Sequence, residues 1–282
     1  MSAYETPVDG SHSDVADSSQ DPPPFDVSTA HPARVYDYLL GGKDNFAADR
    51  AAAAAIIEVS PVVFDCVRAN RAFLRRAVRY LAGEAGIRQF LDIGTGLPTA
   101  QNTHQVAQQV APQCRVVYVD NDPIVLSHAR ALLTSAAAGA CDYIDADLRD
   151  TDKVLDQAAD TLDFSQPVAV MLLCTMQYVP DADDPHAIVS RLVSAVPAGS
   201  YLAMSDTTRD IDTESMTTGA ARYNAKLGSA IFTPRTGSEY ARFFGQLSLV
   251  EPGLVPMPQW RPEGGPSPDE VIPMYAAVGR KL

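Results

Sequence analysis

The sequence predicts an α/β protein with a central, mostly parallel sheet that helices cover on both faces. After Gly86, short apolar runs alternate with segments of helical periodicity, which is typical of consecutive strand–helix–strand units. The run at residues 168–173 is apolar at every position, as expected for a strand buried on both faces. The length of 282 residues suits one large domain with appendages.

Seven strands are expected after Gly86, where the spacing of the apolar residues changes. They lie at residues 89–93, 115–120, 142–147, 168–174, 200–206, 247–251 and 274–279. Between the first five strands, helices are expected at residues 99–111, 123–136, 152–159 and 185–196. The segment 252–273 contains Pro and Gly throughout and is interpreted as a long loop. With no helix between them, the last two strands are expected to form an antiparallel hairpin.

Three helices are expected before the first strand. Apolar residues recur at helical spacing from Pro32 to a glycine pair that ends the first helix. The second helix is expected over residues 46–58. Ser60 is predicted to cap a third helix, with Pro61 in its first turn, and this helix runs to about Ala82.

The N-terminal segment carries much of the net negative charge. Residues 1–28 contain six acids, no Lys or Arg and three consecutive prolines. A segment of this composition buries too little apolar surface to offset its ordering entropy, so we predict a disordered acidic tail. Residues 29–86 would form a helical cap and residues 87–282 the sheet domain. The formal charge of −13 opposes general attraction to nucleic acid or anionic membranes, so neither is an expected partner.

The cysteines and the hydropathy pattern indicate a cytoplasmic protein. The four cysteines stand singly, with no C-x-x-C pair and no nearby His at ligand spacing, so we expect reduced thiols and no metal site. The N-terminus lacks the basic and apolar regions of a secretory signal. No window approaches the roughly 18 to 20 apolar residues of a membrane helix.

The ends of the first three expected strands carry residues suited to a nucleoside. In an open parallel sheet, ligands bind beyond the carboxyl ends of the strands. The first strand ends near Asp92 and the turn Gly94-Thr95-Gly96, whose glycines permit a tight turn and a close approach of ligand to backbone. Asp120 ends the second strand, where it could accept both hydroxyls of a ribose, and Asp147 ends the third, where it could accept an adenine amine. Each acid taken alone could instead cap a helix or form a turn.

Two ligand classes fit a nucleoside held in this way, a dinucleotide and S-adenosylmethionine. The dinucleotide fingerprint requires a third glycine, but Thr99, preceded by Pro98, occupies that position. Asp92 would sit poorly beside a pyrophosphate, whereas it suits the ammonium and sulfonium end of S-adenosylmethionine. Electrostatics therefore favours S-adenosylmethionine as the cofactor.

The strings LDIGTG, VDNDP and DADLRD resemble motifs I, II and III of the class I S-adenosylmethionine-dependent methyltransferases. Three longer strings, at residues 33–50, 90–107 and 115–133, resemble a narrower bacterial family. This family is known only as S-adenosyl methyltransferase, and its substrate is unknown. The resemblance extends over residues 31–282. It implies a Rossmann-like sheet of strand order 3-2-1-4-5-7-6, with strand 7 antiparallel, and an N-terminal helical extension.

The resemblance also implies a cofactor site, consisting of Asp92, Gly94, Thr95, Gly96, Asp120, Asn121, Asp147 and Leu148. The glycine turn and Asp92 would line the methionine end of the cofactor. Asp120 would hold the ribose, with Asn121 beside the adenine. Asp147 and Leu148 would contact the edge and the face of the adenine. Pro98 stands where many class I enzymes have a third glycine.

The catalytic residues are unknown, and no general base for the methyl acceptor is evident. Gln177 and Tyr178 follow the fourth strand, where class I enzymes often carry residues that face the substrate. Gln177 cannot act as a base, while Tyr178 could accept a proton or contact a ring, or could be a half-buried aromatic. Asp206, which ends the fifth strand, is a third candidate. Weaker candidates for the acceptor site, its lid or a closing loop are Thr207, Arg209, Tyr223, Tyr36, Tyr38, Asn45 and Trp260.

The sequence therefore predicts transfer of a methyl group from S-adenosylmethionine to an unidentified, small-molecule acceptor. Two alternatives stay open at this point. The absence of an evident base and the acidic tail also suit a sensor or partner-binding module that binds the cofactor without catalysis. A nicotinamide-dependent (NAD) oxidoreductase is the weaker alternative. The sequence gives no indication of the oligomeric state.

Overall fold

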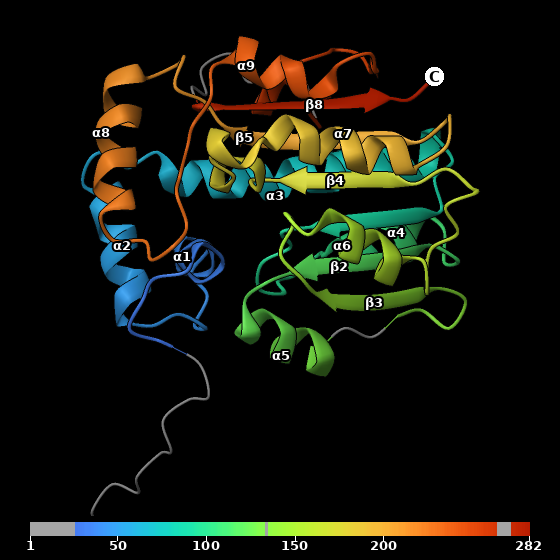
Figure 1. Ribbon diagram of the computed structural model, residues 1–282, viewed down its shortest axis with the longest axis horizontal. Helices are drawn as coiled ribbons and strands as arrows, with labels where there is room; N and C mark the ends of the chain where they lie inside the picture. Colours follow the sequence, from blue (N-terminus) through green and yellow to red (C-terminus); the bar gives the residue numbers. More distant parts are fainter. Residues whose placement is uncertain (1–25, 133–134, 264–271) are drawn as a thin grey trace, which may run out of the picture.

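The computed structural model describes residues 26–132, 135–263 and 272–282, and in these a twisted sheet lies between helices (Figure 1). Its strands follow the order β3-β2-β1-β4-β5-β8-β6, and the short β7 pairs with β8. The seventh expected strand is β8, because β7 (Val255–Pro256) lies inside the segment that was predicted to be a loop. The predicted order of the seven expected strands is confirmed.

The parallel strands lie close to their expected positions: β1 (Gln89–Ile93), β2 (Arg115–Asp120), β3 (Ala140–Asp145), β4 (Ala169–Leu173) and β5 (Tyr201–Thr207). Because β3 begins and ends earlier than predicted, Asp147 lies in the loop beyond it. The strand β8 (Met274–Arg280) runs antiparallel to both β5 and β6 (Ser248–Leu249), which confirms the expected hairpin.

The helices between the parallel strands are α4 (Thr103–Val110), α5 (Pro123–Leu132), α6 (Thr151–Ala158) and α7 (Pro185–Ala195). The predicted start of the first of these at Thr99 is wrong. Asn102 and Gln105 form a capping box, in which the N–H of Asn102 donates to Oε1 of Gln105 at 2.9 Å. The cap fixes the helix start at Thr103, and residues 97–102 form a loop beside the glycine turn.

The N-terminal helices are α1 (Pro32–Leu39), α2 (Ala47–Ile57) and α3 (Val63–Arg79), whose end widens into the π-turn η1 (Tyr80–Glu84). The predicted cap at Ser60 is wrong, because the N–H of Ser60 still bonds back to the carbonyl of Ile56 at 2.8 Å. Ser60 therefore ends the turn after α2, and α3 begins at Val63.

The N-terminal helices contribute to two different clusters of buried side chains. Phe73 of α3 belongs to the same core as Phe90 of β1, so most of α3 packs against the sheet. Leu39 of α1 belongs to a smaller cluster with Tyr223 of α8 (Thr213–Asn224). Helices α1, α2 and α8, here called the cap, stand together at the end of the sheet toward which the arrowheads of β2, β3 and β4 point (Figure 1). The division of the chain at residue 86 stays a prediction.

The remaining elements are short: α9 (Gly237–Ala241), η2 (Met176–Tyr178), η3 (Asp181–Asp183), η4 (Arg242–Phe244) and η5 (Met257–Gln259). Trp260 follows η5 and is fully buried, with its ring 5.2 Å from that of Phe73, so it anchors the loop. All but the last three residues of the predicted disordered tail lie outside the described ranges. Among the described helices, none combines the length and the apolar character needed to cross a bilayer.

Candidate functional site

The turn after β1 is fixed between two neighbouring strands. Gly94 and Gly96 adopt φ angles of +73° and +65°, which favour glycine. The carbonyl of Val119, at the end of β2, accepts the N–H of Gly94 at 2.8 Å. A Cβ atom on Gly94 would lie 2.5 Å from Oγ1 of Thr175, in the loop after β4. The turn therefore packs against the β4 loop through a position that only glycine can fill.

Asp120 holds this turn through its carboxylate. One oxygen accepts the N–H of Gly96 at 2.8 Å, and the other accepts those of Asn121 and Asp122 at 2.9 and 3.0 Å. Burial raises the pKa of Asp120, although the hydrogen bonds from the backbone oppose that change. A carboxylate has about four lone-pair sites, so roughly one is left for a ribose hydroxyl.

Asp92 lies in a cleft beside the turn. The space in this cofactor cleft, part of it open to solvent, is about 290 Å³. The cleft is lined by Arg71, Leu74, Asp92, Thr95, Gly96, Pro98, Asn102, Thr103, Tyr118 and Tyr143. The hydroxyl of Thr103 donates to Oδ2 of Asp92 at 2.6 Å. Burial raises the pKa of Asp92 to about 6, even though this hydrogen bond lowers it. Asp92 is therefore a buried carboxylate that is ionised at neutral pH and suited to a cation.

The adenine-binding prediction involves Asn121, Asp147 and Leu148. Nδ2 of Asn121 lies 3.5 Å from the Asp147 carboxylate, so the structure brings these two side chains together at the rim. Arg149, which the sequence reasoning missed, already donates to the same carboxylate at 2.6 Å and holds the pKa of Asp147 below its usual range. Leu148 is buried in a core cluster that also contains Val154 of α6. A ligand amine would share Asp147 with Arg149.

Six residues of the cleft were not predicted: Arg71, Leu74, Asn102, Thr103, Tyr118 and Tyr143. Tyr118 and Tyr143 face each other in register on β2 and β3, and a pair of tyrosines inside apolar strands is a signal that could have been used. The hydroxyl of Tyr143 is buried, and its hydrogen-bonding neighbour is Thr95, which also lines the cleft. Arg71 comes from α3, where nothing in the sequence distinguishes it from the neighbouring arginines.

The sequence profile of the S-adenosyl methyltransferase family matches residues 18–282. The chain belongs to this family. A DUF574 family protein from Streptomyces avermitilis is 46% identical, with a TM-score of 0.87 and coverage of 91% of this chain and 99% of that one. A Thermobifida fusca protein, provisionally described as a methyltransferase, is 43% identical, with a TM-score of 0.85 and coverage of 93% and 98%. No protein of curated function matches.

The protein is an S-adenosylmethionine-dependent methyltransferase with the class I fold, and S-adenosylmethionine is its cofactor. Both predictions are confirmed. The family decides for the enzyme over the NAD-dependent oxidoreductase and the non-catalytic module. The cleft fits the cofactor chemically, because its buried carboxylate, Asp92, suits the positively charged end of S-adenosylmethionine. The assignment of individual residues to parts of the cofactor stays a prediction.

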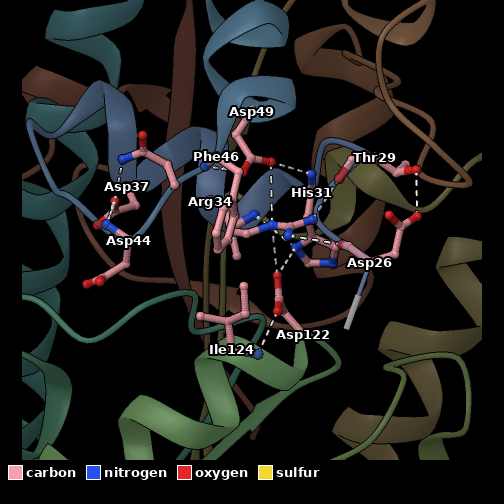
Figure 2. A network of polar contacts seen from close by, with 12 residues as sticks. Asp26, Thr29, His31, Arg34, Asp37, Asp44, Phe46, Asp49, Asp122 and Ile124 are labelled. Atoms are coloured by element: carbon pink, nitrogen blue, oxygen red, sulfur yellow. Dashed lines mark hydrogen bonds and ion pairs between the residues drawn. The ribbon is translucent and has the colours of Figure 1, made fainter. Parts of the chain in front are cut away.

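In this methyltransferase the cap is tied to the loop after β2 by buried charges (Figure 2). Nδ1 of His31 lies 2.9 Å from Oδ2 of Asp122, and Nε of Arg34 lies 3.5 Å from the same oxygen. Nε of Arg34 also lies 3.4 Å from Asp49 of α2. Burial alone would raise the pKa of Asp122, but the contacts with His31 and Arg34 outweigh it and lower the pKa. Asp122 also donates its N–H to the carboxylate of Asp120, the residue predicted to hold the ribose. Asp122 therefore connects the cap to Asp120.

A second and larger pocket lies between the cap, α3 and the loops after β4 and β5. The space between the side chains of this cap pocket, part of it open to solvent, is about 690 Å³. Its lining residues are Val35, Tyr36, Leu39, Ile56, Ser60, Val63, Cys66, Val67, Cys174, Gln177, Tyr178, Thr207, Ser215, Met216, Gly219, Ala220, Tyr223, Phe232, Pro273 and Met274. None of these residues is Asp, Glu, Lys, Arg or His. The pocket is therefore apolar and uncharged.

Two of the three catalytic candidates line the cap pocket, and both are held by neighbours. Oε1 of Gln177 accepts the N–H and the hydroxyl of Thr207 at 2.9 and 2.7 Å. The hydroxyl of Tyr178 lies 3.4 Å from that of Tyr223. Burial raises the pKa of both tyrosines well above the usual value, so both stay protonated at neutral pH.

Asp206, the third candidate, lines neither the cofactor cleft nor the cap pocket. One of its oxygens accepts the N–H of Gln177 at 3.3 Å, and burial raises its pKa well above the usual value. Among the weaker candidates, Tyr36, Thr207 and Tyr223 line the cap pocket. Arg209 pairs with Glu239 at 2.7 Å and Asn45 donates to Asp37 at 2.9 Å. Within the described ranges, no group of three or more His, Cys, Asp or Glu residues could hold a metal ion.

Proposed function

We propose that this methyltransferase acts on a small, uncharged and largely apolar molecule that binds in the cap pocket. The observation that carries the proposal is the lining of the pocket, which contains no charged side chain although 20% of the whole chain is charged. Placing a charged acceptor there would remove it from water without a partner, which costs free energy. A nucleic acid, with a charge on each phosphate, suits neither this pocket nor a chain of charge −13.

The position of the pocket supports the same function. Helix α3 lines both sites, with Val67 at the cap pocket and Arg71 at the cofactor cleft. These residues are one helical turn apart, about 6 Å along the axis. The glycine turn at the cofactor cleft also packs against Thr175, in the loop that carries Gln177 and Tyr178. An acceptor in the cap pocket would therefore lie next to the cofactor.

For the cofactor itself, Asp92 would hold the ammonium group, Asp120 the ribose, and Asn121, Asp147 and Leu148 the adenine. The bound cofactor supplies a methyl group that is already activated on a positively charged sulfur. The residues of this chain are then required mainly to align the acceptor and to exclude water. The cap and α3 provide both, because they enclose the pocket with apolar side chains.

The protonation states around the pocket define the acceptor further. Tyr178 and Tyr223 stay protonated, and burial raises the pKa of the Cys66 thiol to about 12, so none of these groups accepts a proton at neutral pH. Gln177 is not a base. The acceptor atom therefore uses a lone pair that it already carries, as a neutral nitrogen or sulfur does, and any proton it loses goes to water once the methylated product has left the pocket.

A substitution that fills the pocket tests this proposal. Gly219 of α8 lines the cap pocket, and a Cβ atom at this position meets nothing within 4 Å. We expect Gly219→Leu to occupy the pocket without a clash, to lower binding of the neutral apolar dye Nile red at least about tenfold and to leave binding of S-adenosylhomocysteine unchanged. Fluorescence titration and calorimetry measure the two affinities.

The matched control is Thr218→Leu, because Thr218 is the exposed neighbour on the same helix. It should leave both affinities unchanged. Transfer of a labelled methyl group into low-molecular-weight extract, followed by partition into organic solvent, tests the acceptor class directly. Label recovered only in protein or nucleic acid, or equal dye binding by Gly219→Leu and the unchanged chain, would contradict the proposal.

A further inference from the structure

Arg71 reaches the cofactor cleft from α3, outside the strand-end motifs. Its side chain is half-buried. Nη2 donates to the carbonyls of Ala100 and Gln101, at 3.1 and 3.0 Å, in the loop between the glycine turn and α4. In the described part of the chain, Nε and Nη1 of Arg71 have no hydrogen-bond partner, so two sides of the guanidinium are free for a ligand.

Arg71 and Asp92 are the charged residues among those lining the cofactor cleft. The other lining residues are apolar or neutral and polar. The positive charge of Arg71 acts on Asp92, because it opposes the rise that burial causes in the pKa of that carboxyl group. The cleft therefore offers one cation and one anion within a single small space.

The backbone beside the cleft lacks a donor that an anion would otherwise use. Pro98 has no N–H, and α4 begins only at Thr103. The N–H of Thr99 is already donated to Oδ1 of Asn102 at 3.0 Å. Positions 98 and 99 therefore offer no backbone donor to a carboxylate, whereas a guanidinium, which presents donors in a planar fork, suits one.

We propose that Arg71 and Asp92 form a clamp for the amino-acid end of the cofactor, with Arg71 binding its carboxylate and Asp92 its ammonium group. This inference rests on the proposed placement of the cofactor in the cleft. According to this inference, α3, a helix that precedes the sheet in the sequence, contributes a residue to the cofactor site. It also explains how the site tolerates proline at position 98, since the side chain of Arg71 supplies the donors that the backbone lacks.

Calorimetric titrations of the full chain with three ligands distinguish the contribution of Arg71 from that of Asp92. The ligands are S-adenosylhomocysteine, an analogue without the carboxylate (5′-(3-aminopropylthio)-5′-deoxyadenosine) and an analogue without the ammonium group (5′-(3-carboxypropylthio)-5′-deoxyadenosine). We expect Arg71→Met to weaken the binding of S-adenosylhomocysteine and of the carboxylate-bearing analogue by roughly 10- to 100-fold. The affinity for the amine-bearing analogue should change by less than about twofold. Asp92→Asn should show the reverse pattern between the two analogues.

Arg68→Met is the matched control, because Arg68 lies on the same helix, is exposed and pairs with Asp65 at 3.2 Å. It should bind all three ligands as the unchanged chain does. Arg71→Lys keeps the charge and should recover part of the affinity, which keeps the test valid if Arg71→Met folds poorly. Equal loss for all three ligands in Arg71→Met, or no loss for any, would overturn the clamp and leave the proposed cofactor site intact. Failure of the unchanged chain to bind S-adenosylhomocysteine would overturn the cofactor site as well.

Discussion

At the scale of single residues, the protonation of Asp92 links burial to cofactor binding. Burial raises the pKa of Asp92 to about 6, so the carboxylate is mostly ionised at pH 7 and mostly protonated at pH 5. A protonated Asp92 cannot attract an ammonium group. We therefore expect the affinity for S-adenosylhomocysteine to fall about tenfold from pH 7 to pH 5, and calorimetry across this range measures it. Asp92→Asn should flatten the dependence, and an affinity independent of pH in the unchanged chain would contradict the role of Asp92.

Gly94 is the second residue whose role follows from its surroundings. Alanine at this position must adopt a φ of +73° and place Cβ 2.5 Å from Oγ1 of Thr175. We expect Gly94→Ala to lower the free energy of unfolding by about 2 to 5 kcal/mol, from the backbone conformation and the overlap together. Gly253→Ala is the control, because its φ is +89° but its Cβ would meet nothing within 4 Å, and it should cost only about 1 to 2 kcal/mol. Urea denaturation compares the two, and equal losses would mean that the contact with Thr175 is unimportant.

At the scale of elements, the attachment of the cap depends on Arg34 of α1. Its guanidinium lies between Asp49 of α2 and Asp122 of the loop after β2, both of which are nearly fully buried (Figure 2). Removing the cation leaves two buried carboxylates without it, so Arg34→Met should lower the free energy of unfolding by about 3 to 5 kcal/mol. Arg68→Met, which breaks an exposed pair, should cost at most about 1 kcal/mol in the same denaturation experiment. Similar losses in the two variants would show that the buried network contributes little.

The positions of the elements also show what a sequence can and cannot predict. The strands β1 and β2 were predicted to the residue, because their apolar runs are bounded by polar or turn-forming residues. The starts of α3 and α4 were missed, since Ser60 and Thr99 are good caps by residue type while hydrogen bonds from neighbours decide otherwise. The short β7 was missed because it depends on pairing with β8 rather than on its own pattern.

The same contrast holds for the site. The proximity of Asp92, the glycine turn and Asp120 could be predicted, because strand ends in a parallel sheet meet at one edge. Arg71 and Arg149 could not, since one arrives from a helix that packs on the sheet and the other competes for a carboxylate that was assigned to the ligand. The uncharged lining of the cap pocket could not be predicted from the sequence either, because its residues come from segments far apart in the chain.

At the scale of the whole molecule, two pockets lie side by side at the carboxyl ends of the strands. One contains the opposite charges of Arg71 and Asp92, and the other has no charged lining residue. The proposed function requires a particular orientation of the cofactor relative to these two pockets. Its amino-acid end must lie in the cofactor cleft, and its sulfur must face the cap pocket.

The most direct test is a crystal structure of the full chain with S-adenosylhomocysteine. We expect the amino-acid end between Arg71 and Asp92, the ribose at Asp120, and the sulfur directed toward the pocket lined by Tyr178 and Gly219. A ligand bound away from the glycine turn, or one whose sulfur faces away from the cap pocket, would contradict the account.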